Sequence, residues 1–359
     1  MAELPPQSIS TPVIVSVPQR TPLLRRFVFM LLGFFSLILA VGCVVLLGFA
    51  ALTALTGGND SVIEETYHSL DEQGIDKIAI ITVEGTILEG DGFVKRQIDH
   101  VRKDEHVKAI VLRVDSPGGT VTGSDFIYHH LLKLKEAKDK DGKNRKLPLV
   151  VSMGGLAASG GYYVAMAVGD TPEAIFAEPT TWTGSIGVII PHYDLSGLMQ
   201  RVDVVDDSIK SGPLKQMGTF TRPMTPESKK ALQDLVDGSF ARFKKIIRDG
   251  RPRFKAKPGE LDKIATGQVF DTDQALANGL VDKQGFIEEA IDRAVVLAGL
   301  DKTKTKVVKY KRPFALFEGL MASQGSRARA PDLQAVLDLA APRAYYLCTW
   351  LPILARSRD

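Results

Sequence analysis

The chain has 359 residues, enough for one large or two modest domains, and its 45% hydrophobic and 24% charged residues are ordinary for a globular protein. The formal net charge of +3 is too small to indicate nucleic acid as a partner, and we expect none. The two cysteines, Cys43 and Cys348, lie far apart in the sequence and predict neither a disulfide framework nor a metal site.

An uncharged, apolar stretch over residues 27–55 is longer than the roughly 20 residues that span a bilayer. Arginines precede this stretch and acidic residues follow it, so the positive-inside rule predicts a cytoplasmic, disordered tail over residues 1–26 and an extracytoplasmic remainder. A cleaved signal peptide is the alternative, but its apolar core usually has only about 7–15 residues. We therefore expect a retained, single-pass transmembrane helix in the cell membrane.

The rest of the chain predicts an alternation of strands and helices over 76–300, after a polar linker over 56–75. Strands are expected over 77–83, 109–115, 148–153 and 174–177, and a turn with a strand over 183–190. Helices are expected over 94–103, 124–137, 158–168, 195–202 and 225–248, and an extended run over 203–210. This alternation predicts parallel βαβ units and an α/β fold.

A C-terminal extension is expected over residues 301–359. It regains apolar character at 345–351, a segment too short to span a membrane. We expect this segment to pack on a neighbouring surface or to lie at the bilayer surface.

The segment 152–163, SMGGLAASGGYY, follows the predicted strand 148–153, and eight of its twelve residues are Gly, Ala or Ser. A turn of small residues that leaves a strand and opens a helix exposes unpaired N–H groups, beside which a hydroxyl can act as a nucleophile. Ser159 is therefore the candidate nucleophile, and Gly160 supplies a nearby N–H. A second donor could come from Ser116-Pro-Gly-Gly119, because the C-terminal ends of parallel strands meet at one edge of a sheet. The alternative is that both glycine pairs only form tight turns.

The general base is less evident from the residues. Among the six histidines, His192 follows a proline at a strand end and is the best imidazole candidate. Lys210 is the competitor, at the end of an extended run and before a Gly-Pro turn. A lysine acts as a base only when uncharged, and at an ordinary pKa of about 10.4 only about 4 in 10,000 are uncharged at pH 7. Desolvation would have to lower such a pKa by about 3 units, so both candidates stay open at this point.

Five motifs in order resemble the short, single-repeat form of bacterial signal peptide peptidase A, of the protease IV type. The resemblance covers about residues 77–300 and rests on RVDSPGG at 113–119, MGGLAASGGYY at 153–163, TGSIG at 183–187, IKSG at 209–212, and GQVFD at 267–271 with residues 275–285. It implies a Clp-protease or crotonase-like fold behind a membrane anchor. The loop at 216–221 and the stretch at 168–173 depart from the family pattern.

The same resemblance implies the roles of the site residues. Ser159 falls on the nucleophile and Lys210 on the general base of a Ser/Lys dyad. Ser185 falls on the hydroxyl that helps to hold the lysine, and Gly119 and Gly160 fall on the backbone donors of the oxyanion hole. The implied reaction needs no metal and no cofactor.

The resemblance also implies the partners of the chain. It predicts a homo-oligomeric ring, an octamer by similarity, in which neighbouring protomers supply the serine and the lysine of each site. It further predicts peptide substrates, remnant signal peptides among them, and contact with membrane lipid. Two other functions remain to be tested: a catalytically silent, membrane-tethered scaffold that binds peptides, and crotonase-type chemistry on acyl-CoA, against which the extracytoplasmic placement argues.

Overall fold

A computed structural model of the chain describes residues 27, 29–37, 39, 41–42, 63–138, 141–311 and 344–347. It divides the chain into two compact units, Met1–Asp60 and Ser61–Asp359. The described residues of the first unit are helical, with exposed apolar side chains, but no helix of the described residues is both long enough and apolar enough to cross a membrane. The predicted tail and much of the predicted anchor lie outside the described residues, so the transmembrane helix stays a prediction.

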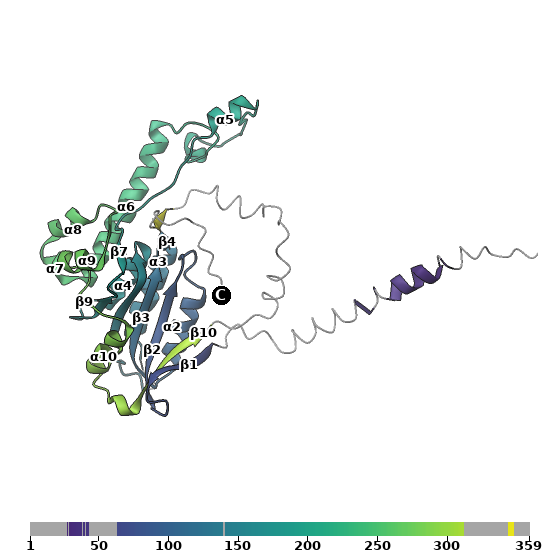
Figure 1. Ribbon diagram of the computed structural model, residues 1–359. Coiled ribbons are helices and arrows are strands. Elements are labelled where there is room, and N and C mark those ends of the chain that lie inside the picture. Colours follow the sequence, from purple (N-terminus) through teal and green to yellow (C-terminus); the bar gives the residue numbers. More distant parts are fainter. Residues whose placement is uncertain are drawn as a thin grey trace, which may run out of the picture. The chain divides into compact units, whose positions relative to one another are not determined.

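The second unit is built on a nine-stranded sheet (Figure 1). The strands run in the order β1 (Glu64–Leu70), β10 (Thr305–Lys311), β2 (Asp76–Glu84), β3 (Val107–Ser116), β5 (Leu149–Ala158), β6 (Ile175–Ala177) and β9 (Lys283–Gln284). All neighbours on this path are parallel except β1 and β10. The end of β5 also pairs in parallel with β7 (Trp182–Gly184), which pairs antiparallel with β8 (Val269–Phe270). The predicted α/β class with parallel strands is confirmed.

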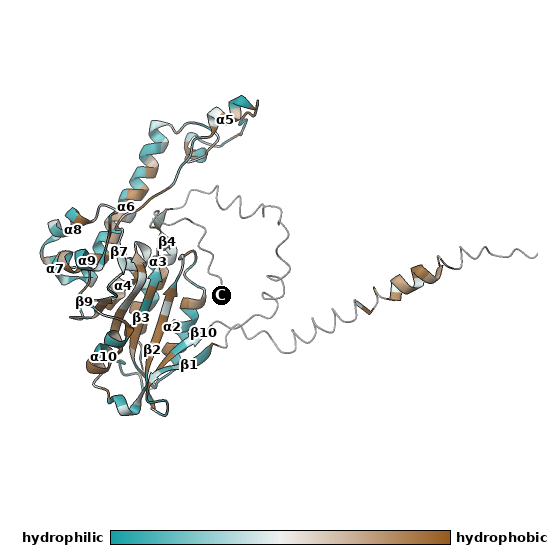
Figure 2. Ribbon diagram, in the orientation of Figure 1, coloured by the Kyte–Doolittle hydropathy of each residue, from teal (hydrophilic) through white to brown (hydrophobic). Residues whose placement is uncertain are grey.

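The central strands form the core because helices cover them. Most side chains of β2, β3 and β5 are buried, and Figure 2 shows these strands as the most hydrophobic part of the sheet. Such continuous apolar runs are typical of parallel strands that are covered on both faces. The covering helices include α2 (Phe93–Lys103) on β2, α10 (Ile287–Ala298) on β3 and β5, and α3 (Val121–Lys135), which packs on α4 (Gly160–Ala165) and the 3-10 turn η1 (Met166–Val168).

Several sequence predictions differ from the structure at the limits of the sheet. Residues 64–70, predicted as part of a linker, form β1, and residues 305–311, predicted as part of an extension, form β10. Both strands lie in the same sheet as the predicted domain, because β10 inserts between β1 and β2. The predicted strand 183–190 is shorter, ending at Gly184, and the predicted extended run 203–210 joins no strand.

Residues 190–225 form an arm that projects from the body of the second unit (Figure 1). The arm contains α5 (Ser196–Arg201) and η2 (Pro213–Gln216), and it leads into the long helix α6 (Pro226–Gly250), which Thr225 caps by accepting from Ser228 N. Its two sides are joined by the hydrogen bond from Leu195 N to Phe220 O. Large apolar side chains on the arm are exposed: Tyr193, Leu198, Val202, Val205 and Ile209.

After α6 the chain returns to the body of the second unit through three short helices: α7 (Pro252–Ala256), α8 (Pro258–Ile264) and α9 (Thr272–Asn278). The turn η3 (Lys302–Lys304) then precedes β10. A separate two-stranded sheet pairs β4 (Gly118–Thr120) with β11 (Tyr345–Leu347).

Candidate active site

Ser159 occupies the sharp turn between β5 and α4, where its backbone has φ 54° and ψ −113°. A positive φ is uncommon for a residue with a side chain and marks local strain. Two hydrogen bonds hold the turn: Ser159 N donates to Gly184 O at 2.8 Å, and Tyr163 N donates to Ser159 O at 2.9 Å. The residue is 1% exposed, and its Oγ has no hydrogen-bond partner among the described residues. A buried hydroxyl left without a partner is costly, which is typical of a group kept for chemistry.

The backbone N–H groups of Gly119 and Gly160 lie close to each other beside this serine. A Cβ placed on Gly160 would lie 3.0 Å from Gly118 Cα and 3.1 Å from Gly119 N. A Cβ on Gly119 would lie 1.8 Å from Ile87 O, so only glycine fits there. The ends of β3 and β5 thus bring the two glycine turns together, as the parallel sheet predicts. Their role as oxyanion donors stays a prediction.

Ser185 lies directly after β7 and next to the serine turn. Its φ is 49°, it is 7% exposed, and its N donates to Gln268 O at 2.7 Å. The carbonyl of the preceding Gly184 accepts from Ser159 N. One peptide group therefore connects the positions of Ser185 and Ser159.

Neither predicted base reaches Ser159 within one chain. Lys210 is exposed on the arm, and its Nζ donates to Gln216 Oε1 at 3.0 Å. His192 also lies on the arm, where its Nε2 is 3.0 Å from Thr219 O. Within one chain the structure therefore brings together Ser159, Ser185, Gly119 and Gly160, but not Lys210.

An extended segment of the chain itself lies in this site. Tyr345–Leu347 pairs antiparallel with β4, with Tyr346 opposite Gly119, and Val121 N donates to Ala344 O at 3.2 Å. On its other edge the segment exchanges two hydrogen bonds with Ile189, at 2.9 and 3.0 Å. A Cβ on Gly118 would meet Tyr346 O at 2.1 Å and Gly160 N at 2.5 Å. The Tyr346 carbonyl therefore lies beside the two glycine amides.

The Tyr346 side chain fills an aromatic pocket next to the serine. Its ring is fully buried, stacks on Tyr163 with centroids 5.0 Å apart, and lies 4.7 Å from the ring of Phe243. Its hydroxyl donates to Ser239 O at 2.8 Å. Burial raises the pKa of the Tyr346 hydroxyl, so the phenol stays neutral.

The wall of this pocket is fixed by an ion pair. Tyr163 donates to Asp125 Oδ1 at 2.5 Å, and Arg242 donates to the same oxygen at 2.7 Å. Burial, followed by the hydrogen bond to Asp125, raises the pKa of Tyr163. The contact ties α6, at the base of the arm, to α3 and α4.

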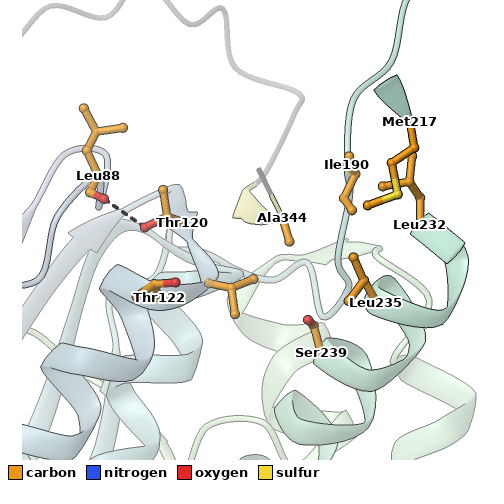
Figure 3. A pocket seen from close by; sticks show the side chains of 10 residues that line it. Leu88, Thr120, Thr122, Ile190, Met217, Leu232, Leu235, Ser239 and Ala344 are labelled. Carbon is orange, nitrogen blue, oxygen red and sulfur yellow. Dashed lines mark hydrogen bonds between the residues drawn. The ribbon is translucent and has the colours of Figure 1, made fainter. Parts of the chain in front are cut away.

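A second pocket, of about 540 Å³, adjoins Ala344 at the start of the bound segment (Figure 3). The hydrogen bond from Thr120 Oγ1 to Leu88 O, 2.8 Å, shapes one wall. Most of the lining is apolar: Leu88, Thr120, Val121, Thr122, Ile190, Met217, Leu232, Leu235, Ser239 and Ala344. An extended chain that continued from Ala344 would meet an apolar surface there.

Sequence reasoning missed the pocket residues Tyr163, Phe243 and Tyr346. The apolar character of residues 345–351 was the only signal, and it indicated packing on some surface without saying which. Tyr345–Leu347 packs on β4 and on α3 and α4 of the chain. Nothing in the local sequence of these three positions shows that they meet.

Comparison with known proteins places the chain among proteases. The family model described as Peptidase family S49 matches residues 141–301. A candidate protease of Synechocystis sp. is 37% identical over 244 residues, which cover 68% of this chain and 82% of that protein. A candidate signal peptide peptidase SppA of Enterococcus faecium is 32% identical over 282 residues, covering 73% of this chain and 76% of that one.

A longer protein and a more distant solved structure also match. Protease 4 of Salmonella typhi is 37% identical over 232 residues, which cover 62% of this chain but 35% of that longer protein. Among solved structures, a ClpP1 mutant from Listeria monocytogenes gives a TM-score of 0.39 at 14% identity, with 59% of this chain and 94% of that chain covered. The matched family region, 141–301, contains Ser159, Gly160, Ser185 and Lys210 but not Gly119.

Proposed function

This chain belongs to peptidase family S49 and is a serine-type protease, and from that premise we propose that it hydrolyses peptide bonds with Ser159 as nucleophile and Lys210 as general base. One observation carries the proposal: the segment Tyr345–Leu347 lies as an added strand between β4 and Ile189, with the Tyr346 carbonyl beside the amides of Gly119 and Gly160. Addition of a strand through backbone hydrogen bonds is a general way to bind an extended peptide.

The first step is attack by Ser159 Oγ on the peptide carbonyl carbon. The proton of the hydroxyl passes to an uncharged amine, and the negative charge develops on the carbonyl oxygen between the N–H groups of Gly119 and Gly160. Fixed backbone donors at this position cost no reorganisation during the reaction. The C–N bond then breaks, the protonated amine returns its proton to the leaving nitrogen, and an ester to Ser159 remains. Water repeats the sequence and releases the acid.

The base comes from a neighbouring protomer in this proposal. Lys210 is exposed on an arm whose apolar side chains are left uncovered by the part of the chain that the structure describes, and a second copy would cover them. Burial of a lysine amine in the interface disfavours its charged form, and lowering an ordinary lysine pKa by about 3 units costs about 4 kcal/mol. The Ser185 hydroxyl would accept from that amine and orient it. A homo-oligomeric ring supplies this contact at every site.

The site favours apolar peptides. The tyrosine-filled pocket and the apolar groove beside Ala344 are suited to side chains of the kind found in remnant signal peptides. An anchor over residues 27–55 would hold the domain outside the cytoplasm at the membrane surface, where such remnants arise.

The test uses the purified full-length chain, an apolar fluorogenic peptide with tyrosine before the cleaved bond, and a fluorophosphonate probe of the serine. We expect Ser159→Ala to lose labelling and turnover, and Lys210→Ala to lose turnover by about 10²–10⁴-fold. Lys215→Ala, which removes an exposed lysine of the same arm, is the matched control. Peptide binding without turnover by the assembled, unmodified chain would contradict the proposal and favour the scaffold function.

A further inference from the structure

The side-chain amide of Gln216 lies between an amine and a carboxylate on the arm. Its Oε1 accepts from Lys210 Nζ at 3.0 Å, and its Nε2 is 3.4 Å from each carboxylate oxygen of Asp206. An amide nitrogen can only donate and an amide oxygen can only accept. The carboxylate on one side and the amine on the other therefore fix a single orientation of this amide.

Asp206 is itself held firmly. Its carboxylate accepts from Ser208 N at 3.1 Å, from Arg222 Nε at 3.3 Å, and from the hydroxyls of Ser208 and Thr221. Its side chain is only 9% exposed in the ion pair with Arg222. The hydrogen bonds from Ser208 and Thr221 hold the pKa of Asp206 well below its usual range, so the anchor of Gln216 stays ionised.

The backbone turn that ends at Gln216 also helps to hold its side chain in place. Gln216 is the last residue of η2, which Pro213 opens, and Met217 N donates to Leu214 O at 3.0 Å to close the turn. Because proline fixes its own φ, Pro213 restricts the first residue of the turn that carries Gln216. The hydrogen bond to Gln216 thus holds the Nζ of Lys210 within one chain, before a second protomer binds.

We propose that Gln216 is a positioning residue for the general base: it holds the Nζ of Lys210 through a neutral amide and keeps the carboxylate of Asp206 one hydrogen bond away. The inference rests on the proposed function, in which Lys210 must be uncharged to act. A carboxylate in direct contact would stabilise the ammonium form, whereas an amide oxygen orients the amine without carrying a full charge. An uncharged amine then donates to Gln216 and Ser185 and keeps its lone pair for the Ser159 hydroxyl.

Few charged groups of the described residues contact Gln216 or the carboxylate of Asp206 that anchors it. Among the described residues, the charged groups that contact Gln216 or its anchor are Lys210, Asp206 and Arg222. The ion pair between Asp206 and Arg222 offsets the charge of the anchor. A carboxylate at position 216 would therefore be the nearest negative charge to the amine.

The experiment measures pH–rate profiles of peptide hydrolysis by the full-length, assembled chain and its variants. Gln216→Glu should shift the acidic limb upward by about 1 pH unit or more, so that activity falls about tenfold near neutral pH and recovers in alkali. Gln216→Met, which keeps the length but loses the acceptor, should lower kcat about tenfold with KM unchanged. Gln200→Glu adds the same charge on α5 of the same arm and should keep the parent profile.

The outcomes separate this inference from the proposed function. If Lys210→Ala keeps the parent activity and profile, the assignment of the base is wrong. If Lys210→Ala is inactive while Gln216→Glu keeps the parent profile, only the role of Gln216 is wrong. Should Gln216→Glu fail to assemble, the Gln216→Met variant decides: a change in KM alone, with kcat intact, overturns the inference.

Discussion

The backbone N–H of Ser159 donates a 2.8 Å hydrogen bond to the carbonyl of Gly184, and this bond joins the turn after β5 to the turn after β7. Each turn carries a serine at positive φ, Ser159 at 54° and Ser185 at 49°. Because both turns follow parallel strands that are neighbours in the sheet, their hydroxyl-bearing residues stay in fixed relation without any help from the arm. One chain therefore fixes Ser159 and Ser185 relative to each other, and in the proposed mechanism a neighbouring protomer supplies the base.

Removal of the Ser159 hydroxyl should cost activity but not stability. The hydroxyl is buried without a partner, and both serine and alanine carry the Cβ that strains this turn. We expect Ser159→Ala to leave the free energy of unfolding unchanged or to raise it by up to about 1 kcal/mol. Urea denaturation followed by circular dichroism measures this change. A clear loss of stability would show that the hydroxyl makes a bond in the native state.

Mixed assemblies should show whether the site is shared between protomers. Ser159→Ala and Lys210→Ala chains are each inactive in the proposed mechanism. Co-assembled in equal amounts, they should recover about one quarter of the parent activity. A site is complete only when the protomer that supplies the serine is the Lys210→Ala variant and its neighbour, which supplies the lysine, is the Ser159→Ala variant. Turnover after unfolding and reassembly of the mixture measures the recovery. No recovery, in mixtures shown to co-assemble, would place both groups in the same chain.

The strand Tyr345–Leu347 should compete with short peptide substrates. Tyr346 anchors it through its buried ring and its bond to Ser239 O. A tethered segment acts at a high effective concentration, so Tyr346→Ala should lower KM for a short peptide about fivefold or more and leave kcat unchanged. Tyr345→Ala, at the adjacent half-buried position, is the control and should change KM little. Equal KM values for all three proteins would argue against competition.

The aromatic pocket should select the residue before the cleaved bond. A series of peptides that differ only there should rank tyrosine above phenylalanine and phenylalanine above alanine in kcat/KM. The ring contacts with Tyr163 and Phe243 favour both aromatic residues over alanine by more than about 10-fold, the least that one methylene contributes, and the Ser239 carbonyl favours the phenol over phenylalanine. Mass spectrometry of the products identifies the cleaved bond. A preference for charged residues would place the pocket elsewhere in the substrate.

Much of the fold could be predicted because its signals are local. The apolar runs of β2, β3 and β5, the helical spacing of α3 and the Thr225–Pro226 start of α6 each lie within a few residues of one another. The small-residue turn around Ser159 was visible for the same reason. The roles of Ser185 and Lys210 came from the resemblance of motifs, since their spacing in the sequence favours no particular chemistry.

The sequence by itself therefore determined the parallel α/β class, the order of its main elements, and a serine held in a glycine-rich turn at a strand end. Only the tertiary structure decided that β1 and β10 extend the sheet, that Tyr346 enters the pocket of Tyr163 and Phe243, and that Lys210 lies on an arm, where it bonds Gln216. The reason is physical: periodicity along the chain is fixed by backbone geometry, whereas a contact between distant segments depends on which surfaces remain to be buried once the sheet has formed.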